Sequence, residues 1–235
     1  MNWRQRLALA IAAFALAAPG CDSLPGRPRP SQRPIQPSQV TSFAVLYRQN
    51  CSGCHGADGR FGAALPLNNP IYLALVDDHH LSKTIAAGVP GTAMPAFAQA
   101  QGGSLSDAQI AIVMQGIRQR WGRTVDFTLP SYAGNGGGDP ARGQKDFQTY
   151  CASCHGADGR GGKAGAVASA AYLALVSDQY LRSLIIAGRP DLGHPDWRGY
   201  GSRPLTAGEI DDLVAWLASQ RLHPHGGAGF TSTEG

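Results

Sequence analysis

Apolar residues recur at helical spacing near the end of each half of the chain, three or four positions apart. Each stretch follows a capping box, Ser106 with Gln109 and Thr206 with Glu209. No segment alternates apolar and polar residues as a half-buried strand would, so the pattern predicts an all-α protein. The periodic positions are Ile110, Val113, Met114 and Ile117 in one stretch and Ile210, Leu213, Val214 and Leu217 in the other.

Start and stop signals place further helices ahead of these. Asp139 and Pro140 supply an N-cap and a first-turn proline for a helix that runs to Tyr150. The matching helix of the first half is expected from near Ser38 to Asn50. Two shorter helices follow in the first half. The first is capped by Asn69, begins at Pro70 and runs through Val76. The second has its N-cap at Asp78 and its terminal glycine at Gly88. Asp178 and Gly188 are the counterparts of this second helix's ends in the second half.

The chain repeats itself with a period of 100 residues and without a gap. The decapeptide Cys51–Arg60, CSGCHGADGR, recurs as CASCHGADGR at Cys151–Arg160, and YLALV at 72–76 recurs at 172–176. A single repeat of this length predicts two copies of one domain and excludes a solenoid. We expect domains at residues 38–121 and 140–222, a flexible glycine-rich linker at 122–139 and a flexible tail at 223–235.

The N-terminus has the pattern of an export signal. Arg4 and Arg6 precede the apolar stretch Leu7–Ala18, which is shorter than the roughly 20 residues that span a bilayer. This predicts a signal peptide over residues 1–20. The sequence before Cys21 resembles a bacterial lipobox, so Cys21 is expected to be lipidated; the alternative is an ordinary cleaved signal that leaves Cys21 without a role.

Residues 21–37 are rich in proline and arginine, which favours an extended spacer between the membrane and the first domain. Together with the signal, this predicts a protein anchored on the periplasmic side of a bacterial membrane, or else a soluble periplasmic protein. The net charge of +4 is modest and forms no long basic run, so nucleic acid is not expected as a partner.

Four of the five cysteines lie in two CxxCH motifs. Two thiols one helical turn apart can each bond to a vinyl group of one porphyrin, and the next histidine then lies under the iron. The alternatives are half a zinc site or a redox dithiol, and both leave the two adjacent histidines unexplained. The motifs predict two covalently bound haem c groups, attached at Cys51, Cys54, Cys151 and Cys154, with His55 and His155 as proximal iron ligands.

A second axial ligand is expected further along each copy. Met94 follows His55 by 39 residues and precedes Pro95 in a glycine- and proline-rich loop. With these features, residues from about 40 to 121 and from 140 to 222 resemble class I cytochromes c. In that family a Met-Pro in this loop supplies the distal thioether, which implies that Met94 is an iron ligand. Met114 lies in a helical apolar stripe, so it is interpreted as a core residue.

The second copy has histidine where the first has methionine. His194 follows His155 by 39 residues, and the proline after it is retained. This predicts a bis-histidine haem of lower potential than the first, because a second imidazole stabilises ferric iron. The alternative is a surface histidine beside a five-coordinate or otherwise ligated iron, for which His223 and His225 of the tail are conceivable ligands.

The resemblance also implies a hydrogen-bond partner for the proximal histidine. In the family, a proline carbonyl in the loop after CxxCH often accepts its second N–H. Pro66 would serve His55 in this way, but its counterpart in the second copy is Ala166.

Two haems with saturated irons predict a one-electron carrier or an electron-transfer subunit of a respiratory or photosynthetic membrane complex. We expect redox proteins as partners and no catalytic residues. The alternative is an enzyme, a dihaem peroxidase or a sulfur-compound dehydrogenase. It would use the haem of the second domain, where Asp191 and Asp196 lie near His194 in the sequence.

Overall fold

The structure is a computed structural model that describes Trp3 and residues 34–221. The chain divides into two compact units, Met1–Gln39 and Val40–Gly235. In the first unit the described residues form one short 3₁₀ helix, η3 (Pro37–Gln39). Apart from Trp3, the predicted signal peptide lies outside the described residues, as do Cys21 and the two tail histidines, His223 and His225.

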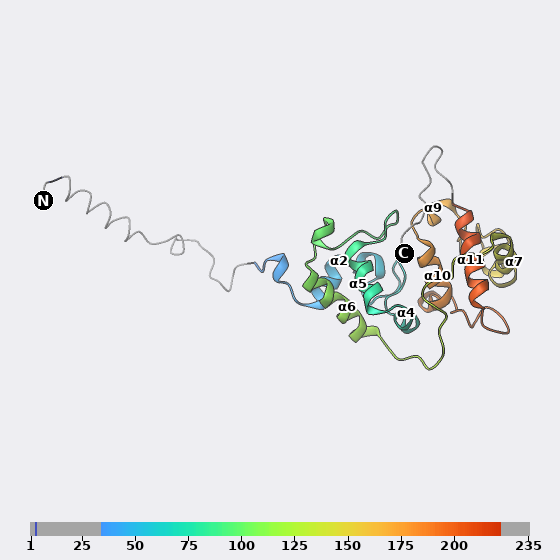
Figure 1. The fold of residues 1–235 in the computed structure, drawn as a ribbon, viewed down its shortest axis with the longest axis horizontal. Helices are drawn as coiled ribbons and strands as arrows, with labels where there is room; N and C mark the ends of the chain where they lie inside the picture. The colour runs from blue at the N-terminus through green and yellow to red at the C-terminus, as the bar shows by residue number, and fades with distance from the viewer. Residues whose placement is uncertain (1–2, 4–33, 222–235) are drawn as a thin grey trace. The chain divides into compact units, whose positions relative to one another are not determined.

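The second unit holds both copies of the repeat and is built of helices (Figure 1). The first copy contains α2 (Phe43–Asn50), α3 (Ser52–His55), α4 (Pro70–Leu75), α5 (Asp78–Ala87), η4 (Gln99–Gln101) and α6 (Asp107–Trp121). The second copy contains α7 (Pro140–Tyr150), α8 (Ala152–His155), α9 (Ala170–Leu173), α10 (Asp178–Ala187), η5 (Pro190–Leu192) and α11 (Ala207–Ser219). Over residues 34–221 there are two isolated bridges and no strand, which confirms the all-α prediction.

Most predicted helix ends are confirmed by their caps. Asn69 accepts hydrogen bonds from the first turn of α4, and both capping boxes are formed. Helices α5 and α10 each begin one residue earlier than predicted. Asp77 and Ser177 are the N-caps, because each side chain accepts from a backbone N–H three residues on, and Asp78 therefore lies in the first turn.

The first long helix is shorter than predicted. It begins at Phe43, not near Ser38, and its N-cap Ser42 makes no side-chain capping bond. The carbonyl of Val40 accepts a hydrogen bond from Nε2 of Gln109, 3.0 Å away. This bond to α6 takes a backbone acceptor that a longer helix would use internally.

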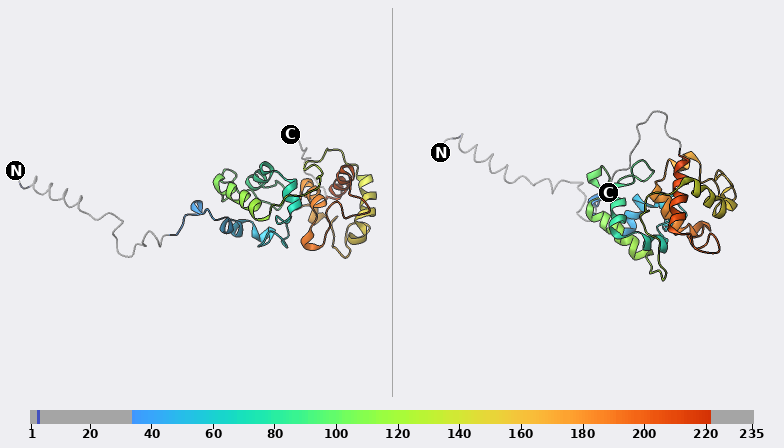
Figure 2. Two further views of the ribbon diagram at one scale, coloured as in Figure 1. Left: turned by 90° about the horizontal axis from the view of Figure 1, so that it is seen from below. Right: turned by 45° about the vertical axis from the view of Figure 1, so that its right-hand side comes forward.

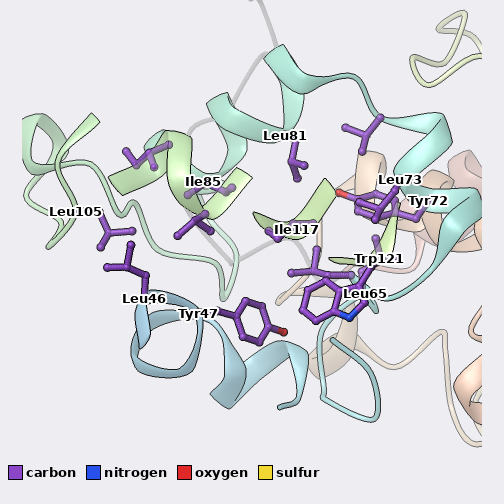
Figure 3. Close-up of a cluster of buried hydrophobic side chains, with 14 of the residues drawn as sticks. Leu46, Tyr47, Leu65, Tyr72, Leu73, Leu81, Ile85, Leu105, Ile117 and Trp121 are labelled. Carbon is purple, nitrogen blue, oxygen red and sulfur yellow. The ribbon is translucent and has the colours of Figure 1, made fainter. Parts of the chain in front are cut away.

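Each copy is organised around its last helix. In Figures 1 and 2, α11 lies beside α7, and α6 packs against both α2 and α5. Aromatic rings join the first and last helices of each copy. Tyr47 meets Trp121 edge-on at 5.1 Å between ring centres (Figure 3), and Phe147 meets Trp216 at 4.3 Å. Tyr47 and Phe147 therefore pack helix against helix.

The two hydrophobic cores are not confined to their own copies. Leu75 of the first copy lies in the core of the second, and Ala187 of the second lies in the core of the first. Asn69 is 1% exposed, and its Nδ2 donates to the Ala187 carbonyl at the end of α10, 2.9 Å away. The two copies therefore share a packed, hydrogen-bonded boundary.

Part of the segment between the copies is held by a buried arginine. Arg182 of α10 is 3% exposed and donates to the carbonyls of Ser131 and Tyr132. Its guanidinium also pairs with Asp211 of α11. These contacts attach residues 131 and 132 to the second copy, ahead of the glycine run.

No helix among the described residues is long and apolar enough to cross a bilayer.

Candidate haem sites

Each CxxCH motif forms one helical turn directly after the first long helix of its copy. The Cys51 N–H donates to the Tyr47 carbonyl and the His55 N–H donates to the Cys51 carbonyl, at 2.8 and 3.0 Å. Residues three apart lie on the same face of a helical turn. The turn α3 thus presents Cys51 and Cys54 together, and α8 does the same for the cysteines of the second copy.

The loop after each motif folds back onto it. In the first copy, the Ala64 N–H donates to the Cys54 carbonyl at 2.9 Å, and the second copy repeats this bond with the same length. Gly62 lies so close that a Cβ there would come within 2.1 Å of the Cys54 carbonyl oxygen. At Gly162 the same contact would be 2.4 Å from the Cys154 oxygen. Glycine at both positions lets the loop close over the attachment turn.

The proximal histidines are oriented by backbone carbonyls. Nδ1 of His55 lies 2.8 Å from the Leu65 carbonyl oxygen, and Nδ1 of His155 lies 2.9 Å from that of Gly165. The prediction of Pro66 was wrong by one residue. The acceptor is a backbone oxygen, so the side chain at 66 is not what matters, and the bond survives in the second copy. Each bond leaves Nε2 free for iron.

Burial of the first cysteine of each motif argues against a redox dithiol. Burial, followed by the charge of the neighbouring cysteine, raises the pKa of Cys51 to about 11 and that of Cys151 to about 12. A redox dithiol works through a thiolate and needs a lowered pKa. Among residues 34–221, no three histidine, cysteine or acidic side chains converge as a metal site.

A pocket in the second copy brings the predicted ligands together. It is lined by Cys151, His155 and His194, with Phe147, Leu181 and Leu213 among its apolar walls. The rings of His155 and His194 are 6.1 Å apart between centres. A metal held between two imidazole nitrogens at about 2 Å from each places the ring centres roughly 6 Å apart. The pocket therefore fits an iron between these two histidines.

One ring nitrogen of His194 has no hydrogen-bond partner in this pocket among the described residues. Its Nδ1 is buried and has no hydrogen-bond partner in the part of the chain that the structure describes. Its Nε2 lies 3.4 Å from the Tyr200 hydroxyl, a long contact. Burial, and then the charge of His155, lowers the pKa of His194, which favours the neutral imidazole that binds metals.

Met94 lies half-buried in a loop that folds as the His194 loop does. The Met94 carbonyl accepts from the Val89 N–H at 3.0 Å, and the His194 carbonyl accepts from the Arg189 N–H at 3.1 Å. The two candidate distal ligands therefore occupy matching places after α5 and α10. Met114 packs against the first core, as expected of a core residue.

Sequence reasoning missed three side chains around His194. Tyr200 lines the pocket, and the ion pair of Arg189 with Asp191 lies at the base of the His194 loop. From the sequence, Asp191 was considered only for the enzyme alternative. All three differ from their counterparts 100 residues earlier, which are alanine, valine and glycine. These breaks in the repeat were a signal that pointed to them.

Comparison with known proteins agrees with this geometry. Residues 38–115 and 138–217 match the family model described as cytochrome c oxidase, cbb3-type, subunit III. The chain is 29% identical over 192 residues to the Cbb3-type cytochrome c oxidase subunit CcoP of Azospirillum sp. (strain B510), covering 75% of this chain and 54% of that protein. The chain thus spans about half the length of this relative.

Among solved structures, the chain is similar to one from the Kuenenia stuttgartiensis reducing HAO-like protein complex Kustc0457/Kustc0458. That match has 17% identity and a TM-score of 0.43, over 81% of this chain and all of the other. The family match covers more than half of the chain and both copies of the repeat. The chain therefore belongs to the family of cbb3-type cytochrome c oxidase subunit III and is a dihaem cytochrome c with two covalently bound haem c groups.

Proposed function

We propose that this protein is the electron-transfer subunit of a membrane-bound respiratory oxidase complex, with one His/Met haem and one bis-His haem. Each haem supplies one-electron transfer at its iron. In the first copy, Cys51 and Cys54 attach the haem, and His55 and Met94 ligate it. In the second copy, Cys151 and Cys154 attach the haem, with His155 and His194 as ligands. The fit of the His155–His194 pair to an iron carries this assignment.

The protein's own residues fix the ligands before any electron moves. Backbone carbonyls orient both proximal imidazoles, and apolar side chains line the second pocket. A ligand held in one position by its surroundings need not reorganise when the iron changes charge. This suits a carrier, which passes electrons without binding a substrate.

The carboxylates near His194 are poorly suited to acid–base catalysis. A hydrogen bond from Arg189 lowers the pKa of Asp191. Burial opposes a similar change at Asp196, but hydrogen bonds from Arg198 outweigh it and lower that pKa as well. A general acid or base works best with a pKa near the operating pH. Both groups are held as ion-paired carboxylates, which supports the carrier over a peroxidase or dehydrogenase.

Electron paramagnetic resonance of the oxidised protein tests the ligation. Two low-spin ferric haems are expected. The optical absorption spectrum gives a second test: any methionine-to-iron charge-transfer band should be lost in Met94→Ala and kept in His194→Ala. A high-spin haem in the wild-type protein would instead indicate an open coordination position and favour catalysis.

The partner and the location rest on the sequence of the N-terminus and on the relative's name. We propose export to the periplasmic side of the membrane and lipidation of Cys21, followed by a spacer. Cys21→Ser should move the protein from the membrane fraction to the soluble fraction. Affinity purification from solubilised membranes should recover other subunits of a cytochrome c oxidase, and recovery of the tethered protein alone would contradict membership of a complex.

A further inference from the structure

Residues that break the 100-residue repeat gather where the two copies meet. Arg189 and Asp191 stand where the first copy has Val89 and Gly91. The ion pair is therefore a feature of the second copy alone. Its side chains are 10% and 3% exposed, so it is buried at this boundary. A buried ion pair is costly to desolvate, so stability alone does not explain it.

One end of the pair is fixed to the His194 loop. Arg189 and His194 exchange both backbone hydrogen bonds, at 3.1 and 3.0 Å. The guanidinium then forms a fork with Asp191, with Nε 3.1 Å from Oδ1 and Nη2 2.8 Å from Oδ2. Forked pairs of this kind fix geometry as well as charge. The position of Arg189 and that of the His194 backbone are thus set together.

The other end reaches the attachment loop of the first haem. Arg189 Nη2 donates to the Gly62 carbonyl at 2.9 Å, and Oδ2 of Asp191 accepts from the Phe61 N–H at 2.8 Å. Gly62 packs directly on the backbone of Cys54 and His55. A short chain of contacts therefore joins the distal loop of one haem to the attachment turn of the other.

Phe61 has an unusual backbone at this contact. Its φ of 63° is the one positive value at a non-glycine position among the described residues. Such a conformation is unfavourable for a bulky residue and persists where the surroundings fix it. In the second copy the same position is Gly161. The strain coincides with the bond to Asp191.

The bonds described above hold the Arg189 guanidinium close to both sites. At the first site it donates to the Gly62 carbonyl, and Gly62 packs on the backbone of Cys54 and His55. At the second site Arg189 exchanges both backbone hydrogen bonds with His194. One cationic side chain therefore lies beside both sites.

We propose that Arg189 is a positioning residue shared by the two haem sites. Its fork to Asp191 and its hydrogen bond to Gly62 fix the position of one haem site relative to the other, and its charge influences the midpoint potentials of both haems. The proposal rests on the proposed ligation by His55 and His194. Arg189 neutralises Asp191, so a protein without it keeps an unpaired carboxylate at this boundary. A negative charge near an iron favours the ferric state, so Arg189 raises the potential of both haems relative to such a protein.

The test is a redox titration of the full haem-loaded protein that resolves the two haems. Arg189→Gln is expected to lower both midpoint potentials. The control is Arg198→Gln. Arg198 forms the same kind of fork with Asp196, at 3.0 and 2.9 Å, in the same loop but 41% exposed. The control should leave the Met94 haem unchanged. A shift confined to the His194 haem in Arg189→Gln, or equal shifts in both variants, would overturn the shared role.

A second variant separates charge from position and covers a failure of Arg189→Gln to fold. Arg189→Lys keeps the charge but lacks the planar fork. It should restore both potentials while slowing electron transfer between the haems after one is photoreduced. Wild-type behaviour in both measurements would overturn the positioning role. The spectra of the wild-type haems test the ligation separately, so a failure of the proposed function is distinguishable from a failure of this inference.

Discussion

The imidazole rings of His155 and His194 line one pocket, with their centres 6.1 Å apart. His194→Met should turn this site into a His/Met site like the first. Because a thioether favours ferrous iron more than an imidazole does, the midpoint potential of the second haem should rise. Redox titration followed in the visible absorption bands measures this.

The reciprocal variant is the control for His194→Met. Met94→His should lower the potential of the first haem and leave the second unchanged. If His194→Met kept a bis-histidine spectrum at an unaltered potential, another histidine would have to be the ligand, and His223 or His225 would be the residue to replace next.

Much of this site was predictable because it depends on local chemistry. The CxxCH spacing, the capping boxes and the loop position of His194 each involve a few residues close in the sequence. The acceptor for His55 was not predictable in the same way. It is the backbone oxygen of Leu65, and every residue has such an oxygen, so no side chain marks it.

The boundary between the copies was not predictable from the repeat. Leu75 and Leu175 are equivalent positions in the repeat. Leu75 is nevertheless buried in the core of the second copy, whereas Leu175 is exposed. Where the two copies pack against each other, a residue of one copy is buried while its counterpart in the other copy stays at the surface. Positions where the copies differ, such as Asn69 and Ser169, were the available signal.

The pair of leucines gives a test with its own control. Leu75 is 8% exposed and Leu175 is 55% exposed. Leu75→Ala should lower the free energy of unfolding by roughly 2–4 kcal/mol, because it leaves a cavity in a packed core. Leu175→Ala should change it by less than about 0.5 kcal/mol. Denaturant unfolding of the haem-loaded protein measures both, and equal losses would contradict the packing across the boundary.

Asn69 has two roles that substitution can separate. Its Oδ1 caps α4, and its Nδ2 donates to the Ala187 carbonyl. Asn69→Ala should cost roughly 2–4 kcal/mol, because it removes the cap and leaves a buried carbonyl unpaired. Asn69→Ser copies the second half of the chain and should recover about 1 kcal/mol by restoring the cap alone.

The matched control for Asn69 is Ser169→Ala. Ser169 accepts from the Tyr172 N–H and caps α9. Its loss should cost about 1 kcal/mol, the ordinary value of a cap. If Asn69→Ala cost no more than this in denaturant unfolding, the bond to Ala187 would contribute nothing to stability.

Glu209 predicts a pH dependence that the first copy lacks. Its carboxylate accepts two hydrogen bonds from Arg203, both 2.8 Å, and completes the capping box with Thr206. The Arg203 hydrogen bonds are the main cause that lowers the pKa of Glu209 in the folded protein. A carboxyl whose folded pKa lies below its unfolded value stabilises the protein above the unfolded pKa, about 4.3. That contribution is lost as the pH falls further toward the folded pKa.

Glu209→Gln should therefore be less stable than wild type at pH 7 by about 1–2 kcal/mol, the range of a hydrogen bond to a charged group. Below about pH 4 the difference should shrink, because unfolded wild type then binds a proton at Glu209 that the folded protein does not bind, whereas the variant has no titrating group there. The first copy already has glutamine at this position, Gln109, so its capping box shows that the amide is tolerated. Urea unfolding of both proteins at pH 7 and pH 3 decides the matter: a constant difference at both pH values would show that the charge of Glu209 does not stabilise the fold.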